Sequence, residues 1–271
     1  MALNTSLGCP FSCHYCCINS VFGQPRARYW SLEKVLSWLD LLADKGVRNI
    51  RFDDELFILS PKRVERFCDM VIERNRDLNF WVYARPDTVP TSLLKKMKKA
   101  GVNWICLGIE SGNKAVRDDV NKKIKGDIKS VVRAMQQQDI FVLGNYMFGL
   151  PEDTLETMED TLRLAMDLNC EFSNFYTVMA LPGSRLYDLA SQQTGGLPEN
   201  WNAFSQLSRD TQPMSTTHLA PAKVLEFRDE AFYRYLENDQ YQRMVRARFG
   251  EKTLAHIQGM LDVKIERELT A

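Results

Sequence analysis

The chain has 271 residues, of which 45% are apolar and 26% charged, a balance that argues against both disorder and a membrane-embedded protein. Lysine plus arginine equals aspartate plus glutamate at 35 each, so no net field attracts nucleic acid or anionic lipid. No run reaches the ~20 apolar residues of a membrane span and no signal peptide is recognisable, so we expect a cytoplasmic protein without nucleic-acid or membrane partners.

Short β-like runs alternate with amphipathic helical patterns along the first two thirds of the chain. Six strands are predicted at residues 2–6, 47–53, 78–84, 102–109, 140–148 and 171–179. Helices are predicted at residues 32–42, 61–72, 91–100, 128–138 and 154–168. Ser31 and the pair Ser60-Pro61 are typical helix starts, Gly101 suits the position after a helix end, and Asp153 with Glu156 has the spacing of a capping pair.

Successive strands begin about 30 residues apart, as expected for βα units around a parallel sheet. Six strands are too few for a complete eight-stranded barrel. We therefore predict an α/β fold, a partial (β/α)6 TIM-like barrel of parallel strands or an open parallel sheet. Residues 1–180 are predicted to form this core and residues 181–271 a mainly helical C-terminal extension packed on it. Chemistry is expected in the loops after the strands, where functional groups of parallel sheets converge.

Four of the seven cysteines lie within nine residues, an arrangement that favours metal binding over a disulfide framework. Cys9, Cys13 and Cys16 follow the first predicted strand with the spacing C-x3-C-x2-C. Three thiolates on a cluster of four irons leave one iron without a protein ligand, whereas simple electron-transfer clusters take four cysteines. An open iron is a place for a cofactor or substrate to bind. The other three, Cys68, Cys106 and Cys170, are expected in the core.

Two alternatives give the cluster of thiols no such role. A structural zinc ion would use the three cysteines with His14 or Cys17, but zinc sites usually include a distant second pair of ligands, which this sequence lacks. The thiols are alternatively a chance cluster of buried side chains. Cys17 directly follows the third ligand and should not bind the same iron, so a structural or solvent-shielding role is expected for it.

The cysteine motif resembles the hallmark of the radical S-adenosylmethionine (SAM) superfamily, in which an aromatic residue often precedes the last cysteine. Tyr15 fills that place here. The resemblance implies a [4Fe–4S] cluster on Cys9, Cys13 and Cys16, with SAM bound to the open iron. It also implies that an injected electron cleaves SAM to a 5′-deoxyadenosyl radical.

Four further motifs, with the wider stretch around the cysteines, resemble the cobalamin-associated branch of that superfamily, and the resemblance covers roughly residues 4 to 190. They are F-D-D-E-L-F, Y-A-R-P-D, G-I-E-S-G and F-G-L-P-E-D-T, together with the wider stretch T-S-L-G-C-P-F-S-C-H-Y-C-C. Each short motif alone is weak, but their order is specific.

The resemblance implies SAM contacts after the second and third strands. Asp53, Asp54 and Glu55 are expected near the SAM amino group, because carboxylates accept hydrogen bonds from an ammonium; the alternative is an acidic helix start or a solvated loop. Arg85 is expected to pair with the carboxylate of SAM or of an acidic substrate. Arg85 is alternatively a brace for a neighbouring carboxylate, Asp87 or Glu110.

Later strand ends carry the remaining implied contacts. Glu110 and Ser111 are candidate hydrogen-bonding partners of SAM, although their flanking glycines are also suited to a tight turn. Gly149, Leu150 and Pro151 are expected to contact the adenine ring through their backbone.

The family pattern breaks at the N-terminus, because cobalamin-associated relatives usually carry a cobalamin-binding domain and only eight residues precede Cys9. A D-x-H-x-x-G segment is also missing, so none of the three histidines is a candidate cobalamin ligand. Cobalamin therefore has no support within this chain, and that domain is expected to be absent.

The leading hypothesis is a radical SAM enzyme that abstracts hydrogen from a small molecule, with a reductant such as flavodoxin or ferredoxin as electron donor. The alternatives are a radical SAM methyltransferase core that uses cobalamin from a separate domain or chain, and a non-catalytic iron–sulfur electron carrier.

Overall fold

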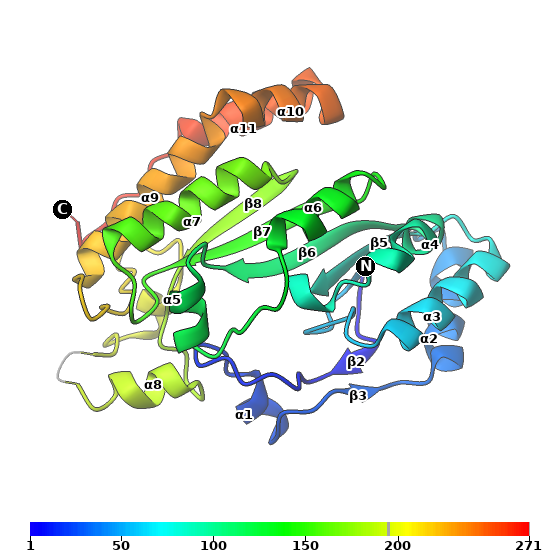
Figure 1. Ribbon diagram of the computed structural model, residues 1–271, viewed down its shortest axis with the longest axis horizontal. Coiled ribbons are helices and arrows are strands. Elements are labelled where there is room, and N and C mark those ends of the chain that lie inside the picture. Colours follow the sequence, from blue (N-terminus) through cyan, green and yellow to red (C-terminus); the bar gives the residue numbers. More distant parts are fainter. Residues whose placement is uncertain (194–195, 271) are drawn as a thin grey trace. The chain divides into compact units, whose positions relative to one another are not determined.

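A computed structural model describes residues 1–193 and 196–270 (Figure 1). The chain groups into two compact units that are interleaved along the sequence. The first unit consists of Met1–Phe11, Phe22–Ile109 and Ile124–Gly144, and the second of Ser12–Val21, Glu110–Lys123 and Asn145–Ala271. The boundary predicted near residue 180 is not one of these limits. The division into residues 1–180 and 181–271 therefore stays a prediction.

The main sheet has six strands in the order β1-β4-β5-β6-β7-β8. Its strands are β1 (Ala2–Leu3), β4 (Asn49–Phe52), β5 (Asn79–Ala84), β6 (Val102–Glu110), β7 (Phe141–Phe148) and β8 (Phe172–Thr177). The pairs β1–β4, β4–β5 and β5–β6 are parallel. The predicted α/β fold with a six-stranded parallel sheet is confirmed. Each strand begins within two residues of its predicted start, and β1 ends three residues earlier than predicted.

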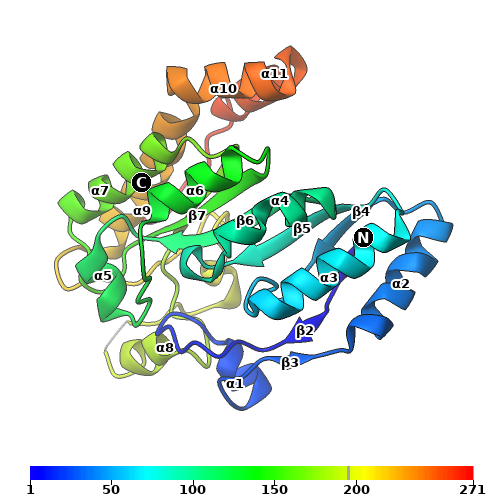
Figure 2. The same cartoon turned by 45° about the vertical axis from the view of Figure 1, so that its right-hand side comes forward.

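The first unit contains the helices α2 (Leu32–Asp44), α3 (Pro61–Arg74), α4 (Leu94–Lys99) and α6 (Ile128–Gln136). Their starts follow the predicted caps: the side chain of Ser31 accepts a hydrogen bond from Lys34 N, and that of Ser60 from Arg63 N. α4 ends where Gly101 adopts a φ of +94°, as expected for a glycine after a helix. α2, α3 and α4 lie side by side in both Figure 1 and Figure 2.

The core of the first unit is a group of phenylalanine rings between the sheet and α3. Phe52 stacks on Phe57 with ring centroids 4.8 Å apart and on Phe80 at 5.2 Å. The ring of Phe67 from α3 meets Phe52 edge-on at 5.7 Å. Burial of each such side chain contributes roughly 1.5–3 kcal/mol, so this group holds α3 firmly on the strands.

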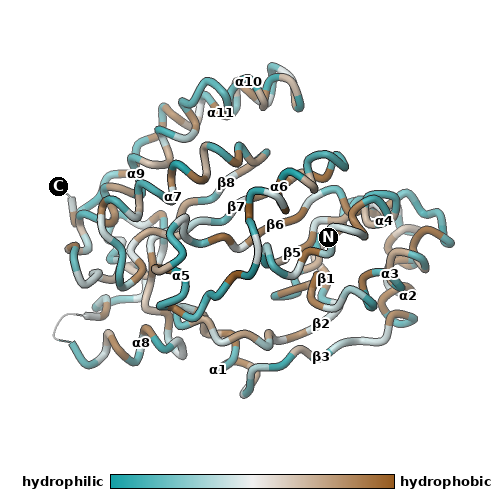
Figure 3. The backbone as a smooth tube through the Cα atoms, in the orientation of Figure 1, coloured by the Kyte–Doolittle hydropathy of each residue, from teal (hydrophilic) through white to brown (hydrophobic). Residues whose placement is uncertain are grey.

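The second unit is mainly helical around β8 and the end of β7. Its helices are α5 (Lys114–Asp119), α7 (Leu155–Leu168), α8 (Arg185–Ala190), α9 (Pro221–Leu236), α10 (Asp239–Phe249) and α11 (Glu251–Leu261). α9 packs against β8 and α7, and the ring of Phe175 lies 5.3 Å from Tyr235 of α9. Hydrophobic and hydrophilic residues alternate along the helices in Figure 3, as expected where one face is buried.

Local details differ from the sequence-based expectations. The capping box of α7 is formed by Thr154 and Thr157, not by Asp153 and Glu156, because the carboxylate of Asp153 is turned back toward the preceding loop. The short antiparallel pair of β2 (Ser6–Leu7) with β3 (Arg28–Tyr29), and α1 (Ile18–Phe22), were not predicted. Within residues 1–193 and 196–270, none of the helices is both long and apolar enough to cross a bilayer.

Candidate cluster and cofactor site

The cysteine loop is divided between the two units: Cys9 belongs to the first, and Cys13 and Cys16 to the second. Cys9 and Cys13 are half-buried and Cys16 is exposed. Within the second unit, Cys16 N donates to Cys13 O at 3.1 Å, which closes a turn between the two thiols, and the Cys13 thiol faces Asn121 O at 3.9 Å. In the described part of the chain, no three Cys, His, Asp or Glu side chains are gathered as ligands of one ion.

The scattered cysteines differ from those of the loop. Cys68, Cys106 and Cys170 are each at most 3% exposed, which confirms that they belong to the core. Burial raises the pKa of Cys68 and of Cys170 to about 12, so both are thiols near neutral pH. Because iron and zinc bind the thiolate, these two residues are poor candidates for a distant second pair of metal ligands.

Tyr15 anchors the loop of Cys13 and Cys16 in the second unit. Its ring packs against an apolar group that contains Val116, Val120, Leu150, Val178 and Leu186. Burial and the negative charge of Glu110 raise the pKa of the Tyr15 hydroxyl well above its usual range, and the hydroxyl lies within hydrogen-bonding reach of Glu110 and Cys13. Tyr15 therefore links the thiol loop to the end of β6.

Glu110 and Lys122 form a buried ion pair beside Tyr15. Lys122 Nζ donates to Glu110 Oε1 at 2.9 Å, and the two side chains are 7% and 10% exposed. Glu110 has a φ of +66°, in the left-handed region where a non-glycine residue is strained. A strained backbone and a buried charge pair at the end of a parallel strand are features that cluster at functional sites.

Ser111 is fully buried, and its hydrogen bonds lie within the second unit. Its hydroxyl is 3.2 Å from Thr161 Oγ1 and accepts from Asn113 N at 3.1 Å, while its carbonyl accepts from Arg117 Nη1. The neighbouring Gly112 admits no side chain, because a Cβ there would lie 2.6 Å from Asp160 O. These contacts fix the turn after β6 against α7.

The segment after β7 is held by Asp153. Its Oδ2 accepts from Gly149 N at 3.0 Å and from Leu150 N at 2.9 Å, and its Oδ1 accepts from Thr157 Oγ1 at 2.7 Å. Burial raises the pKa of Asp153 to about 6 in spite of these three donors. The carbonyl of Pro151 accepts from Thr217 N at 2.8 Å. Much of the backbone expected to contact adenine is therefore already hydrogen-bonded.

In the first unit, Asp54 and Glu55 bind the backbone that precedes the cysteine loop. Asp54 is 2% exposed and accepts from Thr5 N at 2.5 Å, Thr5 Oγ1 at 2.6 Å and Ser6 Oγ at 2.7 Å. Glu55 Oε2 accepts from Gly8 N at 2.9 Å, one residue before Cys9. Both carboxylates thus position the chain that leads into the thiol motif.

Asp53 and Arg85 are paired with charges next to them in sequence. Asp53 is half-buried and accepts from Arg51 Nε at 2.6 Å. Arg85 is 3% exposed and donates to both oxygens of Asp87, at 2.9 and 3.2 Å, and its guanidinium lies 3.8 Å from the ring centroid of Phe11. Arg85 is therefore paired with Asp87, which was the alternative to a contact with the carboxylate of SAM or of a substrate.

Tyr15, Glu110 and the loop of Cys13 are brought together within the second unit, and Asp54, Glu55 and the start of the cysteine loop within the first. Sequence reasoning missed Lys122 and Asp153. The sequence gives only a weak signal for Lys122. Val116 and Val120 have helical spacing, which indicates a short helix after β6, and Lys122 follows that helix where the chain can turn back toward the end of the strand. Asp153 was recognised only as a helix cap, whereas its carboxylate organises the loop before the helix.

His14, the alternative zinc ligand, is turned toward a cation. Its Nε2 lies 3.5 Å from Arg185 Nη1, and partial burial, followed by the charge of Arg185, lowers the pKa of the imidazole. A metal ion at Nε2 would meet the guanidinium at that distance. The geometry therefore does not favour His14 as a ligand.

Comparison with known protein families matches residues 3–165 to the sequence profile described as the radical SAM superfamily. An uncharacterized methyltransferase of Pyrococcus horikoshii is 28% identical over 205 residues, which cover 75% of this chain and 44% of that protein. The chain thus spans less than half of the length of this curated relative.

Two solved structures share the fold. A cobalamin-dependent SAM radical enzyme, OxsB, superposes with a TM-score of 0.67 at 16% identity, over 96% of this chain and 45% of that one. A radical SAM methyltransferase, TsrM from Kitasatospora setae, superposes with a TM-score of 0.63 at 20% identity, over 70% and 36%. At these identities the similarity concerns the fold alone.

Proposed function

The chain belongs to the radical SAM superfamily, and from that premise we propose that it carries a [4Fe–4S] cluster on Cys9, Cys13 and Cys16 and cleaves SAM to begin a radical reaction. When bound, the cluster supplies the electron that breaks a carbon–sulfur bond of SAM and releases the 5′-deoxyadenosyl radical. The observation that carries the proposal is the contrast between accessible thiols on one short loop and the buried thiols elsewhere.

The donor set fits an iron–sulfur cluster better than a closed zinc site. Three thiols are at least partly accessible within eight residues, as the ligands of one cluster must be. Cys17 remains outside the proposed ligand set, because it directly follows Cys16 and its side chain therefore points in a different direction. Three ligands leave an iron for SAM.

We assign the SAM contacts in two groups. Tyr15, Glu110 and Lys122 form a hydrogen-bonded charge pair and aromatic wall beside the loop of Cys13. The Lys122 ammonium has the charge needed by the SAM carboxylate, and Glu110 has the charge needed by the SAM amino group. In the first unit, the side chain of Asp53 is 32% exposed whereas Asp54 is buried, so Asp53 is our candidate there for a polar contact with SAM.

The remaining residues act as positioning residues under this proposal. Asp54 and Glu55 hold the chain before Cys9, Ser111 holds the turn after Glu110, and Arg85 braces Asp87. Gly149, Leu150 and Pro151 offer a short, tightly fixed backbone for the adenine ring. Its rigidity comes from the Asp153 carboxylate, which binds both Gly149 N and Leu150 N.

The reaction begins with one electron from an external reductant of the flavodoxin or ferredoxin type. With the cluster held by Cys9, Cys13 and Cys16, the 5′-deoxyadenosyl radical would take a hydrogen atom from a C–H bond of a small-molecule substrate and would leave 5′-deoxyadenosine and a substrate radical. An apolar, closed site protects such radicals from water. A reducing compartment such as the cytoplasm suits both the cluster and the seven cysteines, none of which is joined in a disulfide in the described chain.

A second candidate is a radical SAM methyltransferase core that uses cobalamin held elsewhere in a longer protein or by another chain. The methyltransferase relative favours it. The two candidates share the cluster and SAM and differ in the fate of the substrate radical. The third candidate is a non-catalytic electron carrier, which would need no binding site for SAM.

The test is anaerobic reconstitution with iron and sulfide, followed by SAM and dithionite and measurement of 5′-deoxyadenosine by mass spectrometry. The wild type is expected to form 5′-deoxyadenosine, and Cys13→Ala to form none. Cys17→Ala is the matched control and is expected to keep the activity. A reconstituted [4Fe–4S] cluster that leaves SAM intact would move the assignment to the electron carrier. Transfer of the methyl group of SAM to added cobalamin, measured as S-adenosylhomocysteine, would favour the second candidate.

A further inference from the structure

A cavity of about 500 Å³ lies in the second unit beside β8, away from the cysteine loop in sequence. Five consecutive residues of the strand, Phe172 to Tyr176, line it. Successive side chains of a strand point to opposite faces, so a cavity lined by all of them lies along the strand's edge rather than on one face. β8 is the last strand in the sheet order, and its outer edge therefore carries main-chain groups without a neighbouring strand.

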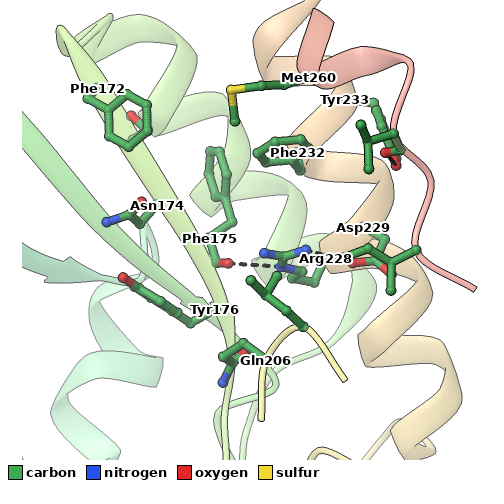
Figure 4. Close-up of a pocket in the computed structure, with 14 residues that line it drawn as sticks. Phe172, Asn174, Phe175, Tyr176, Gln206, Arg228, Asp229, Phe232, Tyr233 and Met260 are labelled. Atoms are coloured by element: carbon green, nitrogen blue, oxygen red, sulfur yellow. Dashed lines mark hydrogen bonds and ion pairs between the residues drawn. The ribbon is translucent and has the colours of Figure 1, made fainter. Parts of the chain in front are cut away.

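Alternate residues of β8 direct their main-chain groups toward this edge. Phe175 O accepts from Arg228 Nε at 2.9 Å, and Thr177 N donates to Gln206 Oε1 at 2.9 Å. In a strand, the main-chain groups of every second residue point to the same edge, here those of residues 173, 175 and 177. The N–H groups of Ser173 and Phe175 therefore point toward the cavity. Figure 4 shows Arg228 of α9 reaching across to Phe175.

Arg228 and Asp229 line the cavity, and Arg267 contacts Asp229 from outside the lining, so the charges of this group do not balance. Asp229 accepts from Arg228 Nη1 at 2.7 Å and from Arg267 Nε and Nη2 at 2.8 and 3.0 Å. Arg228 and Arg267 are 9% and 6% exposed, so a single carboxylate serves two buried guanidinium groups. One positive charge is left over. Buried charges are normally paired, and an anion in the cavity would supply the missing partner.

The rest of the cavity is apolar. Phe232, Tyr233 and Met260 line it from the helices, and Val263 and Ile265 line it from the C-terminal segment. Leu207 and Val263 are each 64% exposed, which leaves apolar side chains at its accessible margin. Its volume is within the roughly 300–1,000 Å³ typical of small-molecule sites.

We propose that this cavity binds an amphipathic carboxylic acid. The carboxylate accepts from the Arg228 guanidinium and from the edge N–H of Ser173, and the apolar body lies between Phe232 and Met260 (Figure 4). Such a ligand neutralises the surplus charge and covers the open edge of β8. This binding site is separate from the residues proposed above for the cluster and SAM, and it does not depend on their assignment.

The test is calorimetric titration of the full chain with decanoate, decanol and decylammonium, each below its micelle concentration. A charge-assisted hydrogen bond predicts an affinity for decanoate about tenfold or more above that for decanol, with decylammonium weaker still. Arg228→Gln is expected to reduce decanoate binding to the level of decanol. Equal affinities for the three head groups would overturn the proposal.

A second pair of variants keeps the test decisive if Arg228→Gln does not fold. Leu207→Asp places a negative charge at the margin of the cavity and is expected to weaken decanoate binding about tenfold. Leu189→Asp changes another exposed leucine, 46% exposed on α8 and outside the cavity lining, and is expected to leave binding unchanged. Equal binding by wild type and Leu207→Asp, or equal losses in both leucine variants, would contradict the assigned site.

Discussion

Replacing Lys122 with methionine is expected to destabilise the protein markedly, because it leaves the carboxylate of Glu110 buried without its cation. The two groups are 2.9 Å apart and their side chains are at most 10% exposed, so water cannot replace the lost partner without a local opening. Removing one member of such a pair costs about 3–5 kcal/mol. The expected loss of stability is therefore about 3–5 kcal/mol, a large share of the roughly 5–15 kcal/mol that stabilises a typical folded protein.

The assay is urea unfolding of the cluster-free protein followed by circular dichroism at pH 7.5. Lys123→Met is the matched control, since that lysine is exposed, and is expected to stay within about 0.5 kcal/mol of wild type. The double variant of Lys122→Met with Glu110→Gln is expected to lose less than the sum of the single losses, because neither buried charge remains. A Lys122→Met protein as stable as its control, or strictly additive losses, would refute the described pair.

Three further changes test the strand-end loops. Gly149→Ala is expected to cost about 2–4 kcal/mol in urea unfolding, since its φ is +88° and its Cβ would lie 2.5 Å from Val224 Cγ1; Val224→Ala should offset part of that loss. Asp54→Ala is expected to cost about 2–4 kcal/mol, because the buried N–H and hydroxyl of Thr5 lose their acceptor. Folding raises the pKa of Asp153 from 3.8 to about 6, so the folded state holds its proton more tightly than the unfolded chain. The proton on Asp153 stabilises the folded state by up to about 3 kcal/mol below pH ~4, and this contribution is lost as the pH rises to about 6. Asp153→Asn is expected to remove this part of the pH dependence of the free energy of unfolding.

Each of these has a clear contrary outcome. Equal losses for Gly149→Ala in the presence and absence of Val224→Ala would mean that the clash is not with that side chain. An Asp54→Ala protein that unfolds like wild type would mean that water reaches Thr5. Identical slopes of stability against pH for wild type and Asp153→Asn would show that the Asp153 carboxyl titrates in its ordinary range.

The sheet was predictable because each strand is a short apolar run followed by a helix with its own start signal. Ser31 and Ser60 mark such starts, and both cap as expected. The error at α7 has a physical origin. Asp153 and Thr154 are both good capping residues, and the choice between them depends on the loop of Gly149 and Leu150, whose N–H groups take the aspartate.

The candidate site was only partly predictable, because its residue types follow from the motif but their partners do not. Glu110 is evident at the end of a strand, yet its ion pair with Lys122 depends on the path of the chain through α5. Arg85 had two possible partners in sequence, and short range favours Asp87 two residues away. The surplus charge at Arg228 arises from Arg267, 39 positions later, which no local pattern connects to it.

The most direct measurement is electron paramagnetic resonance of the dithionite-reduced, reconstituted protein with and without SAM, together with its iron content. Three cysteine ligands and one open iron predict about four irons per chain and a spectrum whose g-values shift when SAM is added, in the wild type and in Cys17→Ala alike. Loss of the cluster in Cys17→Ala, or a spectrum that SAM leaves unchanged, would contradict the account, because both indicate a fourth protein ligand where SAM should bind.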